Sequence, residues 1–397
     1  MNLEALARQA REVLEVPRDL ALGRYPGFVT GGALPRGHVP VFVFHTLEPD
    51  DFTRKLEHLA RNGYVTLGAH DYLQVLMGAR AAPERAVVLT FDDGRGSLWS
   101  VGAPLLKRFG MRGIVFLVPG RIASRPGPPA PTWDDVGAGR AAAGDVLRRE
   151  DGEGAFLSWE EIEALARDGP FDFQSHTLTH GRVHTHPEVV GFVTPAARRG
   201  YAAMDTPLVR DEAGRDLMGE EVPLGTPILR SAPRLAEEPR FFEDPATRDP
   251  AVRMVAAEGG PAFFEQPHWR TRLRRLVDAH PIQGRRETPE ERVAAVRHEL
   301  LESRRLIQQR TGAEVTHLCY PWHVSGPTAR QAAVEAGYRA VYWGKVTGIP
   351  VTLPGHDPQR IARVGEDYVE LLPGQGRSSL VDVLQRKWKR RFAQGGV

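Results

Sequence analysis

The sequence has little of what marks several large classes of protein. Its 397 residues include a single cysteine, Cys319, which excludes an internal disulfide framework and a zinc site built from cysteines. Lysine and arginine total 52 and aspartate and glutamate total 50, so the net charge is only +2 and we expect no nucleic-acid partner. No apolar run approaches the roughly 20 residues that cross a bilayer. These absences leave a metabolic or binding protein with an ordinary globular composition.

The beginning of the sequence also lacks a recognisable export signal. Residues 1–16 alternate charged and apolar side chains at helical spacing, and they contain no uninterrupted apolar stretch of the kind found in secretory signal peptides. We therefore expect a cytoplasmic location.

Short apolar runs alternate with helical patterns along most of the chain. The predicted strands are residues 38–44, 86–91, 113–118, 171–175, 315–320, 338–343 and 360–364. Strands separated by helices pair in parallel, and continuous apolar runs are typical of strands covered on both faces. About seven such units predict an α/β fold, a distorted or seven-stranded (β/α) barrel, rather than an open sheet.

Three segments depart from this alternation within what we expect to be a single barrel of residues 1–397. Residues 184–286 are rich in proline, glycine and arginine but keep several aromatics, so we predict an insertion folded at the barrel mouth. Residues 121–153 offer little to bury and are predicted to be a flexible loop. Residues 378–397 are predicted to be a basic helix, either solvated or in peripheral contact with a membrane surface.

Two adjacent carboxylates follow the predicted strand 86–91. Asp92 and Asp93, with Gly94 behind them, suit a turn, which is the simpler interpretation. Each carboxylate also raises the cost of ionising the other, and a divalent metal would remove this cost by binding one and leaving the other free as a base.

A pair of histidines follows the predicted strand 171–175. His176 and His180 are four residues apart and can face one point if the chain turns helically, which suits metal binding. A pair of exposed loop histidines is the alternative. His184 and His186 follow closely and are interpreted as loop residues of the insertion.

The third group, Tyr320, Pro321 and Trp322, follows the predicted strand 315–320. It suits a rigid turn, but aromatic rings at a strand end can also form the wall of a sugar-binding pocket. All three groups lie at the carboxyl ends of strands, where a barrel places its chemistry.

These motifs resemble those of the polysaccharide deacetylases, the NodB-homology domains of carbohydrate esterase family 4. Thr90–Gly94 reads TFDDG, residues 176–180 fit H-[ST]-x-x-H, and residues 320–322 are similar to the family's aromatic groove motif. The resemblance covers roughly residues 38–183 and 288–365.

The resemblance implies a role for each residue. Asp93, His176 and His180 would hold a divalent metal, commonly zinc, with cobalt, nickel or iron as alternatives, and Asp92 would be the general base. The reaction would be hydrolysis of an acetamide on a sugar, polysaccharide or glycoconjugate, with a histidine protonating the departing amine.

The sequence departs from the family pattern at two points. Cys319 occupies the position where the groove motif usually has an arginine, and Arg363 is a candidate to replace it. No late motif supplies the acid histidine. His45, after the predicted strand 38–44, is preferred to His356, although a histidine packed in the core would give the same pattern.

Other activities remain open at this point. A metal-dependent amidase acting on a non-sugar amide would use the same motifs, and a non-catalytic carbohydrate-binding module would keep the groove without turnover. A glycosidase needs carboxylates on different strands, roughly 5 Å or more apart, which adjacent aspartates do not suit.

Overall fold

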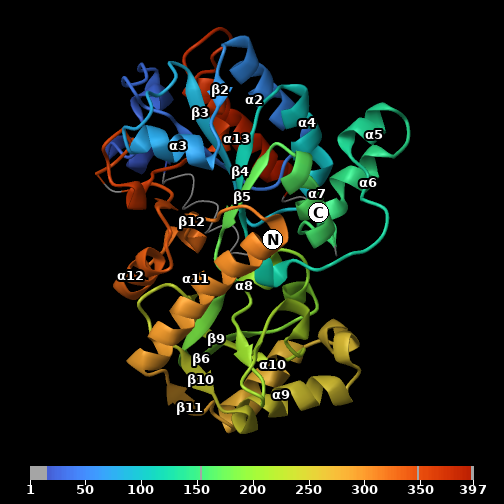
Figure 1. Ribbon diagram of the computed structural model, residues 1–397. Helices are drawn as coiled ribbons and strands as arrows, with labels where there is room; N and C mark the ends of the chain where they lie inside the picture. Colours follow the sequence, from blue (N-terminus) through green and yellow to red (C-terminus); the bar gives the residue numbers. More distant parts are fainter. Residues whose placement is uncertain (1–15, 153, 347, 395–397) are drawn as a thin grey trace.

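A parallel sheet forms the centre of the molecule (Figure 1). The computed structural model describes residues 16–152, 154–346 and 348–394, so the helix expected at the start of the chain lies outside the described residues. In sheet order the strands are β13 (Ala340–Tyr342), β12 (His317–Cys319), β5 (Phe171–Ser175), β4 (Gly113–Leu117), β3 (Ala86–Phe91), β1 (Val41–Phe44) and β14 (Val364–Gly365). A short strand, β2 (Val65–Thr66), pairs with the start of β3.

The two edges of this sheet meet at the segment that leads into β14. Ile361 forms a parallel bridge with Tyr342 of β13, and Val364 pairs with Phe42 of β1. Two backbone hydrogen bonds of 2.9 Å hold Ile361 against β13. The sheet therefore curves into a barrel of seven parallel strands, and the predicted fold class is confirmed.

Helices cover the outside of the barrel. They are α2 (Pro49–Arg61), α4 (Ala103–Arg108), α7 (Trp159–Asp168), α11 (Pro289–Thr311), α12 (Pro327–Glu335) and α13 (Leu380–Gln394). Helix α3 (Ala69–Leu76) packs instead against the other face of the sheet, where the ring of Tyr72 lies 6.4 Å from that of Tyr342. The capping boxes predicted at Ser158 and Thr288 begin α7 and α11, where each side chain accepts a hydrogen bond from the backbone N–H three residues on.

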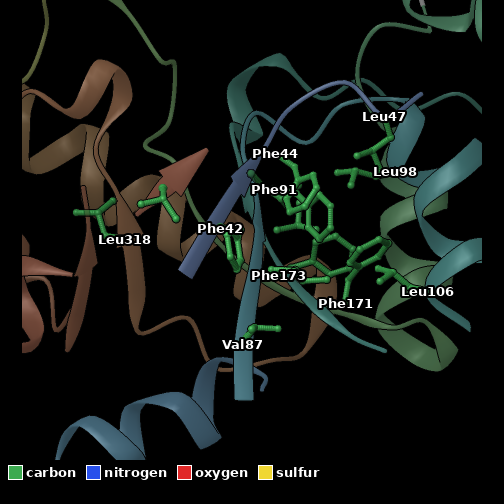
Figure 2. Packing of buried hydrophobic residues seen from close by; sticks show 14 of the residues in the cluster. Phe42, Phe44, Leu47, Val87, Phe91, Leu98, Leu106, Phe171, Phe173 and Leu318 are labelled. Atoms are coloured by element: carbon green, nitrogen blue, oxygen red, sulfur yellow. The ribbon is translucent and has the colours of Figure 1, made fainter. Parts of the chain in front are cut away.

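The strands are apolar on both faces because both faces are covered. On the outer face, the ring of Phe91 lies 5.2 Å from that of Phe44 and 5.6 Å from that of Phe171, and these rings point towards Leu98 and Leu106 (Figure 2). Alternate residues of β3 and β4 pack in a second buried cluster on the opposite face. The continuous apolar runs of the sequence follow from this double burial.

Residues 182–286 form a region with a hydrophobic core of its own. Its strands are β6 (Arg182–Phe192), β7 (Val209–Arg210), β8 (Asp216–Leu217), β9 (Pro227–Pro233), β10 (Phe241–Glu243) and β11 (Gly284–Arg286), and its helices are α8 (Ala202–Asp205), α9 (Pro245–Ala257) and α10 (Trp269–Ala279). Phe192, Leu229 and Leu273 belong to its buried cluster. Figure 1 shows α9 and α10 on the side away from the barrel, and α11 leads the chain back to it.

The structure corrects two expectations about the segments outside the barrel. The predicted flexible loop 121–153 contains two short helices, α5 (Trp133–Gly137) and α6 (Ala143–Leu147), and Val146 is buried. His184 and His186 lie in strand β6 instead of a loop, and His184 is buried beside Glu243 at 3.2 Å. Among the described residues, the helices are too short or too polar to cross a membrane.

Candidate active site

The chain turns sharply where β3 ends, and both carboxylates are buried there. Asp93 has φ of 70° and Gly94 has φ of 69°, and a Cβ on Gly94 would lie 2.8 Å from the side chain of Leu117. The turn interpretation is therefore correct, but it does not exclude chemistry. Asp92 and Asp93 are only 2% and 4% exposed, and buried carboxylates require cationic partners.

Arg363 is the partner of Asp92. Its guanidinium donates two hydrogen bonds to the carboxylate, at 2.7 and 2.8 Å, and lies 2.9 Å from Sγ of Cys319. Burial favours the neutral acid, but the charges of Arg363 and His176 outweigh it and hold the pKa of Asp92 well below its usual range. The small side chain of Cys319 leaves room for an arginine that arrives from another strand, as expected for Arg363.

Asp93 divides its two oxygens between different partners. Arg95 donates to Oδ2 at 2.9 and 3.1 Å. Oδ1 faces the Nε2 atoms of His176 and His180, at 3.6 and 3.8 Å. Burial would raise the pKa of Asp93, but the charges of Arg95 and the histidines lower it to about 2. One oxygen of an ionised carboxylate is thus directed at two imidazoles.

Each imidazole presents Nε2 to Asp93. Nδ1 of His176 lies 2.8 Å from the carbonyl oxygen of Cys319, and because a carbonyl only accepts, Nδ1 donates this hydrogen bond and Nε2 is the atom that faces Asp93. Burial, followed by the charge of His176, lowers the pKa of His180 to about 3, so this ring is neutral at neutral pH. Its Nδ1 is buried without a hydrogen-bond partner in the described part of the chain.

These donor atoms fit a divalent metal. Oxygen and nitrogen ligands of a tetrahedral zinc ion, bound at about 2.0–2.2 Å, lie roughly 3.4 Å from one another. The ligand atoms of Asp93, His176 and His180 lie within 4.8 Å of one another. A second group, Asp92, His176 and Cys319, is equally compact, but Arg363 contacts both its carboxylate and its sulfur, and burial raises the pKa of the Cys319 thiol. The group that contains Asp93 is the better metal site.

Strained backbone and a buried glutamate shape the loop that carries the histidines. Thr177 and His180 have φ of 69° and 49°, values that residues with side chains rarely adopt. Glu299 of α11 accepts hydrogen bonds from the backbone N–H and the hydroxyl of Thr179, at 3.0 and 2.6 Å. Glu299 could not be predicted from the sequence, since one glutamate in a helix with many charged residues does not stand out from the others.

The two histidines predicted as candidates for the acid, His45 and His356, lie in very different places. His45 is exposed at the end of β1, so it is not packed in the core, and its charge acts on both Asp92 and Asp93. His356 lies at the other end of the barrel, since its neighbour Gly355 bonds to Leu76 at the end of α3. The exposed His323, which the sequence analysis missed although it follows Trp322, also acts on Asp92.

The predicted aromatic wall is only partly available to a ligand. Tyr320 is 1% exposed and packs against Trp343 with ring centroids 5.0 Å apart, and Pro321 is buried as well. Trp322 is partly exposed, and its ring lies 4.2 Å from that of His180. The expectation of stacking rings is therefore corrected for Tyr320, whose ring belongs to the core, and only Trp322 keeps an accessible face.

Two segments outside the barrel support Arg95. The ring of Tyr201, in the region 182–286, lies 3.5 Å from the guanidinium carbon. Thr46 accepts a hydrogen bond from Arg95 at 2.8 Å and donates one to Glu150 at 2.7 Å. Composition and periodicity could not place these segments near Asp93, because the contacts join residues 49 to 106 positions apart in the chain.

Comparison with known sequences supports the motif assignment. Residues 79–196 match the family model of the polysaccharide deacetylases, so the predicted resemblance is confirmed. A poly-β-1,6-N-acetyl-D-glucosamine N-deacetylase of Escherichia coli K12 is 28% identical over 120 residues, which are 30% of this chain and 16% of that protein. YxkH of Bacillus subtilis is 26% identical over 88 residues, 20% of this chain and 32% of that protein. The chain thus spans less than a third of either relative.

Solved structures support the fold. The BpsB deacetylase domain from Bordetella bronchiseptica is 17% identical and has a TM-score of 0.50, over 84% of this chain and 97% of that chain. At this identity the similarity establishes only the fold, and the function depends on the residues that form the site of this chain.

Proposed function

With residues 79–196 assigned to the polysaccharide deacetylase family, we propose that the chain hydrolyses the N-acetyl group of a sugar, polysaccharide or glycoconjugate with the help of a divalent metal. The observation that carries the proposal is the position of Asp93 Oδ1, 3.6 and 3.8 Å from the Nε2 atoms of His176 and His180. Three oxygen and nitrogen donor atoms that converge in a buried site are typical of a metal-binding site.

Asp93, His176 and His180 would hold the ion, which we propose to be zinc, with cobalt, nickel or iron as alternatives. A divalent ion supplies Lewis acidity, which lowers the pKa of water and polarises a carbonyl. Arg95 leaves Oδ1 of Asp93 free by binding Oδ2, and the carbonyl of Cys319 fixes the ring of His176. The protein thus supplies a set of ligands that is already oriented.

Asp92 is the proposed general base. It accepts a proton from the water that attacks the acetyl carbon, and Arg363 keeps it ionised and oriented through two hydrogen bonds. The bond between the carbonyl carbon and the nitrogen then breaks, and acetate and an amine are released. His45 is the proposed acid, because it is exposed beside both aspartates and an imidazole exchanges protons near neutral pH.

Substrate contacts are proposed for the residues that follow β12. The accessible face of Trp322 would pack on a sugar ring next to His180. Tyr320 and Pro321 would contribute through the shape of the loop, since their side chains are buried.

Metal content and acetate release test the proposal together. We expect nearly one divalent ion per chain, measured by elemental analysis of protein purified without chelator, and little in His176→Ala. His186→Ala is the matched control, because His186 is exposed on β6 and lies outside the ligand group. Acetate release from N-acetylated sugars should follow metal content in all three proteins.

Other outcomes would favour the competing functions. If none of the three proteins holds metal after incubation with zinc or cobalt, the hydrolytic mechanism fails and a carbohydrate-binding module becomes the better interpretation. If metal is present but only non-sugar amides are cleaved, the site is that of an amidase. A cytoplasmic location and a membrane contact through the basic C-terminal helix stay predictions.

A further inference from the structure

A cavity lined by several cationic side chains opens beside the proposed reaction centre. It has a volume of about 510 Å³, and its lining includes His323 and Arg363. Arg363 also holds Asp92, at 2.7 Å, so this side of the cavity adjoins the proposed general base. The cavity and the proposed general base therefore share one side chain, Arg363.

Cations from separate parts of the chain meet in this cavity. Arg18 and Arg24 come from the N-terminal segment, Lys345 follows β13, Lys387 belongs to α13, and Arg363 precedes β14. Arg24, Lys345 and Lys387 have side chains that are 33%, 33% and 31% exposed, so their charged ends reach solvent. The overall balance of 52 cationic and 50 acidic residues does not account for such a concentration.

The carboxylates nearby do not balance these charges. Asp19 is shared by Arg24 and Lys345, Asp367 lies 3.3 Å from Lys387, and Asp92 is bound to Arg363. Arg18 is exposed and has no carboxylate within 4.0 Å in the described part of the chain. Within residues 16–394, as far as the structure describes them, the five cations of the lining contact three carboxylates, and a concave surface with excess positive charge concentrates anions.

We propose that this cavity binds an anionic substituent, a carboxylate or a phosphate, on the sugar that the site deacetylates. Lysine and arginine are the side chains that recognise such oxyanions. Tyr25 and Tyr368, whose hydroxyl oxygens lie 3.2 Å apart, also line the cavity, but both rings are largely buried, so the cations are the groups that would recognise the substituent. The proposal rests on the proposed deacetylation and narrows its substrate to acidic sugars, unlike the uncharged polymer named for the Escherichia coli relative.

Matched substrates test the proposal on the full chain. The substrates are N-acetylglucosamine 1-phosphate, an N-acetylglucosaminuronic acid methyl glycoside and the uncharged methyl N-acetylglucosaminide, at constant ionic strength. We expect kcat/KM for at least one acidic substrate to exceed that of the uncharged one by about tenfold or more. The acidic substrate that gains distinguishes a phosphate site from a carboxylate site. Equal values for all three would overturn the proposal.

Two variants test whether the cavity causes the preference for acidic substrates. In Lys345→Met the preference should fall by about tenfold, mainly through KM, because a charged contact to the substituent is lost. Lys389→Met is the control, since Lys389 is exposed on α13 and does not line the cavity, and it should keep the preference of the wild type. A preference that survives in Lys345→Met, or falls equally in Lys389→Met, would contradict the proposal.

Binding of inorganic phosphate separates this proposal from the proposed function. Phosphate should raise the Tm of the wild type and raise it less in Lys345→Met. If phosphate binds in this way but no sugar is deacetylated, the cavity is supported and the enzymatic proposal fails. If sugars are deacetylated but phosphate does not bind and no acidic substrate is preferred, the cavity proposal fails and the enzymatic one stands.

Discussion

The bodies of the barrel strands and their carboxyl ends differ in almost every physical property, although they are continuous in sequence. Phe44 and Phe91 are 1% and 0% exposed and belong to the hydrophobic core, and the residue after each is charged or titratable: His45 and Asp92. Of the six non-glycine residues with positive φ in the described chain, five lie in the loops at these ends. The change from apolar packing to titratable side chains therefore takes place within one residue of each strand.

The contrast shows how the fold divides its tasks. Stability comes from large rings buried between the sheet and the helices, where the loss of one ring leaves a cavity. The ends of the strands hold buried charges and strained backbone, both of which oppose folding. The free energy gained by packing the strand bodies therefore has to exceed the free energy that the strand ends cost.

The largest effect on activity is expected from His45→Gln. Loss of the proposed acid should lower kcat by about 10²–10⁴-fold, because the departing amine would then take its proton from water. Since the side chain is exposed, the free energy of unfolding should change by no more than about 0.5 kcal/mol. Acetate release and urea unfolding measure the two quantities. Retained activity would remove His45 from the mechanism and leave His323 as the candidate.

Phe44→Ala, at the residue before His45, should give the opposite result: a large loss of stability with the metal site kept. Removal of a buried ring in contact with Phe52 and Phe91 should lower the free energy of unfolding by roughly 3–5 kcal/mol. The folded fraction should still bind one metal ion per chain, since Phe44 touches none of the proposed ligands. A large loss of metal affinity without loss of stability would show that strand bodies and strand ends are not separable.

A smaller effect, which depends on pH, is expected inside the barrel. His317 of β12 is 1% exposed, its Nδ1 lies 3.0 Å from the hydroxyl of Tyr342, and burial lowers its pKa to about 3. The unfolded chain binds a proton below pH 6.5 and the folded chain does not, so stability is lost as pH falls from 6.5 towards 3. This loss approaches about 1.4 kcal/mol per pH unit.

His317→Gln should remove that contribution while keeping a polar partner for Tyr342. Urea unfolding at pH 7.5 and pH 5 should therefore show a smaller difference in the variant than in the wild type. An identical difference in both proteins would mean that other groups cause the acid sensitivity.

The sequence predicts the strand bodies well and the surroundings of the ends poorly. The predicted strands 86–91 and 171–175 match β3 and β5 residue for residue. In β3 burial on both faces leaves a nearly continuous apolar signal, whereas in β5 the signal is the pair Phe171 and Phe173. Asp92, Asp93, His176 and His180 are identifiable because they directly follow such runs. Their supports are not, since Glu299, Tyr201 and Glu150 approach from distant segments through single polar contacts that leave no periodic pattern.

The closure of the barrel by residues 361–365 has a consequence for biosynthesis. Arg363 is 271 positions away from the Asp92 that it orients, so the proposed base has no arginine partner until all of these intervening residues have left the ribosome. A nascent chain that already contains Asp93, His176 and His180 would have its metal ligands but not its oriented base. The proposed catalytic centre is therefore completed only after the sheet has closed.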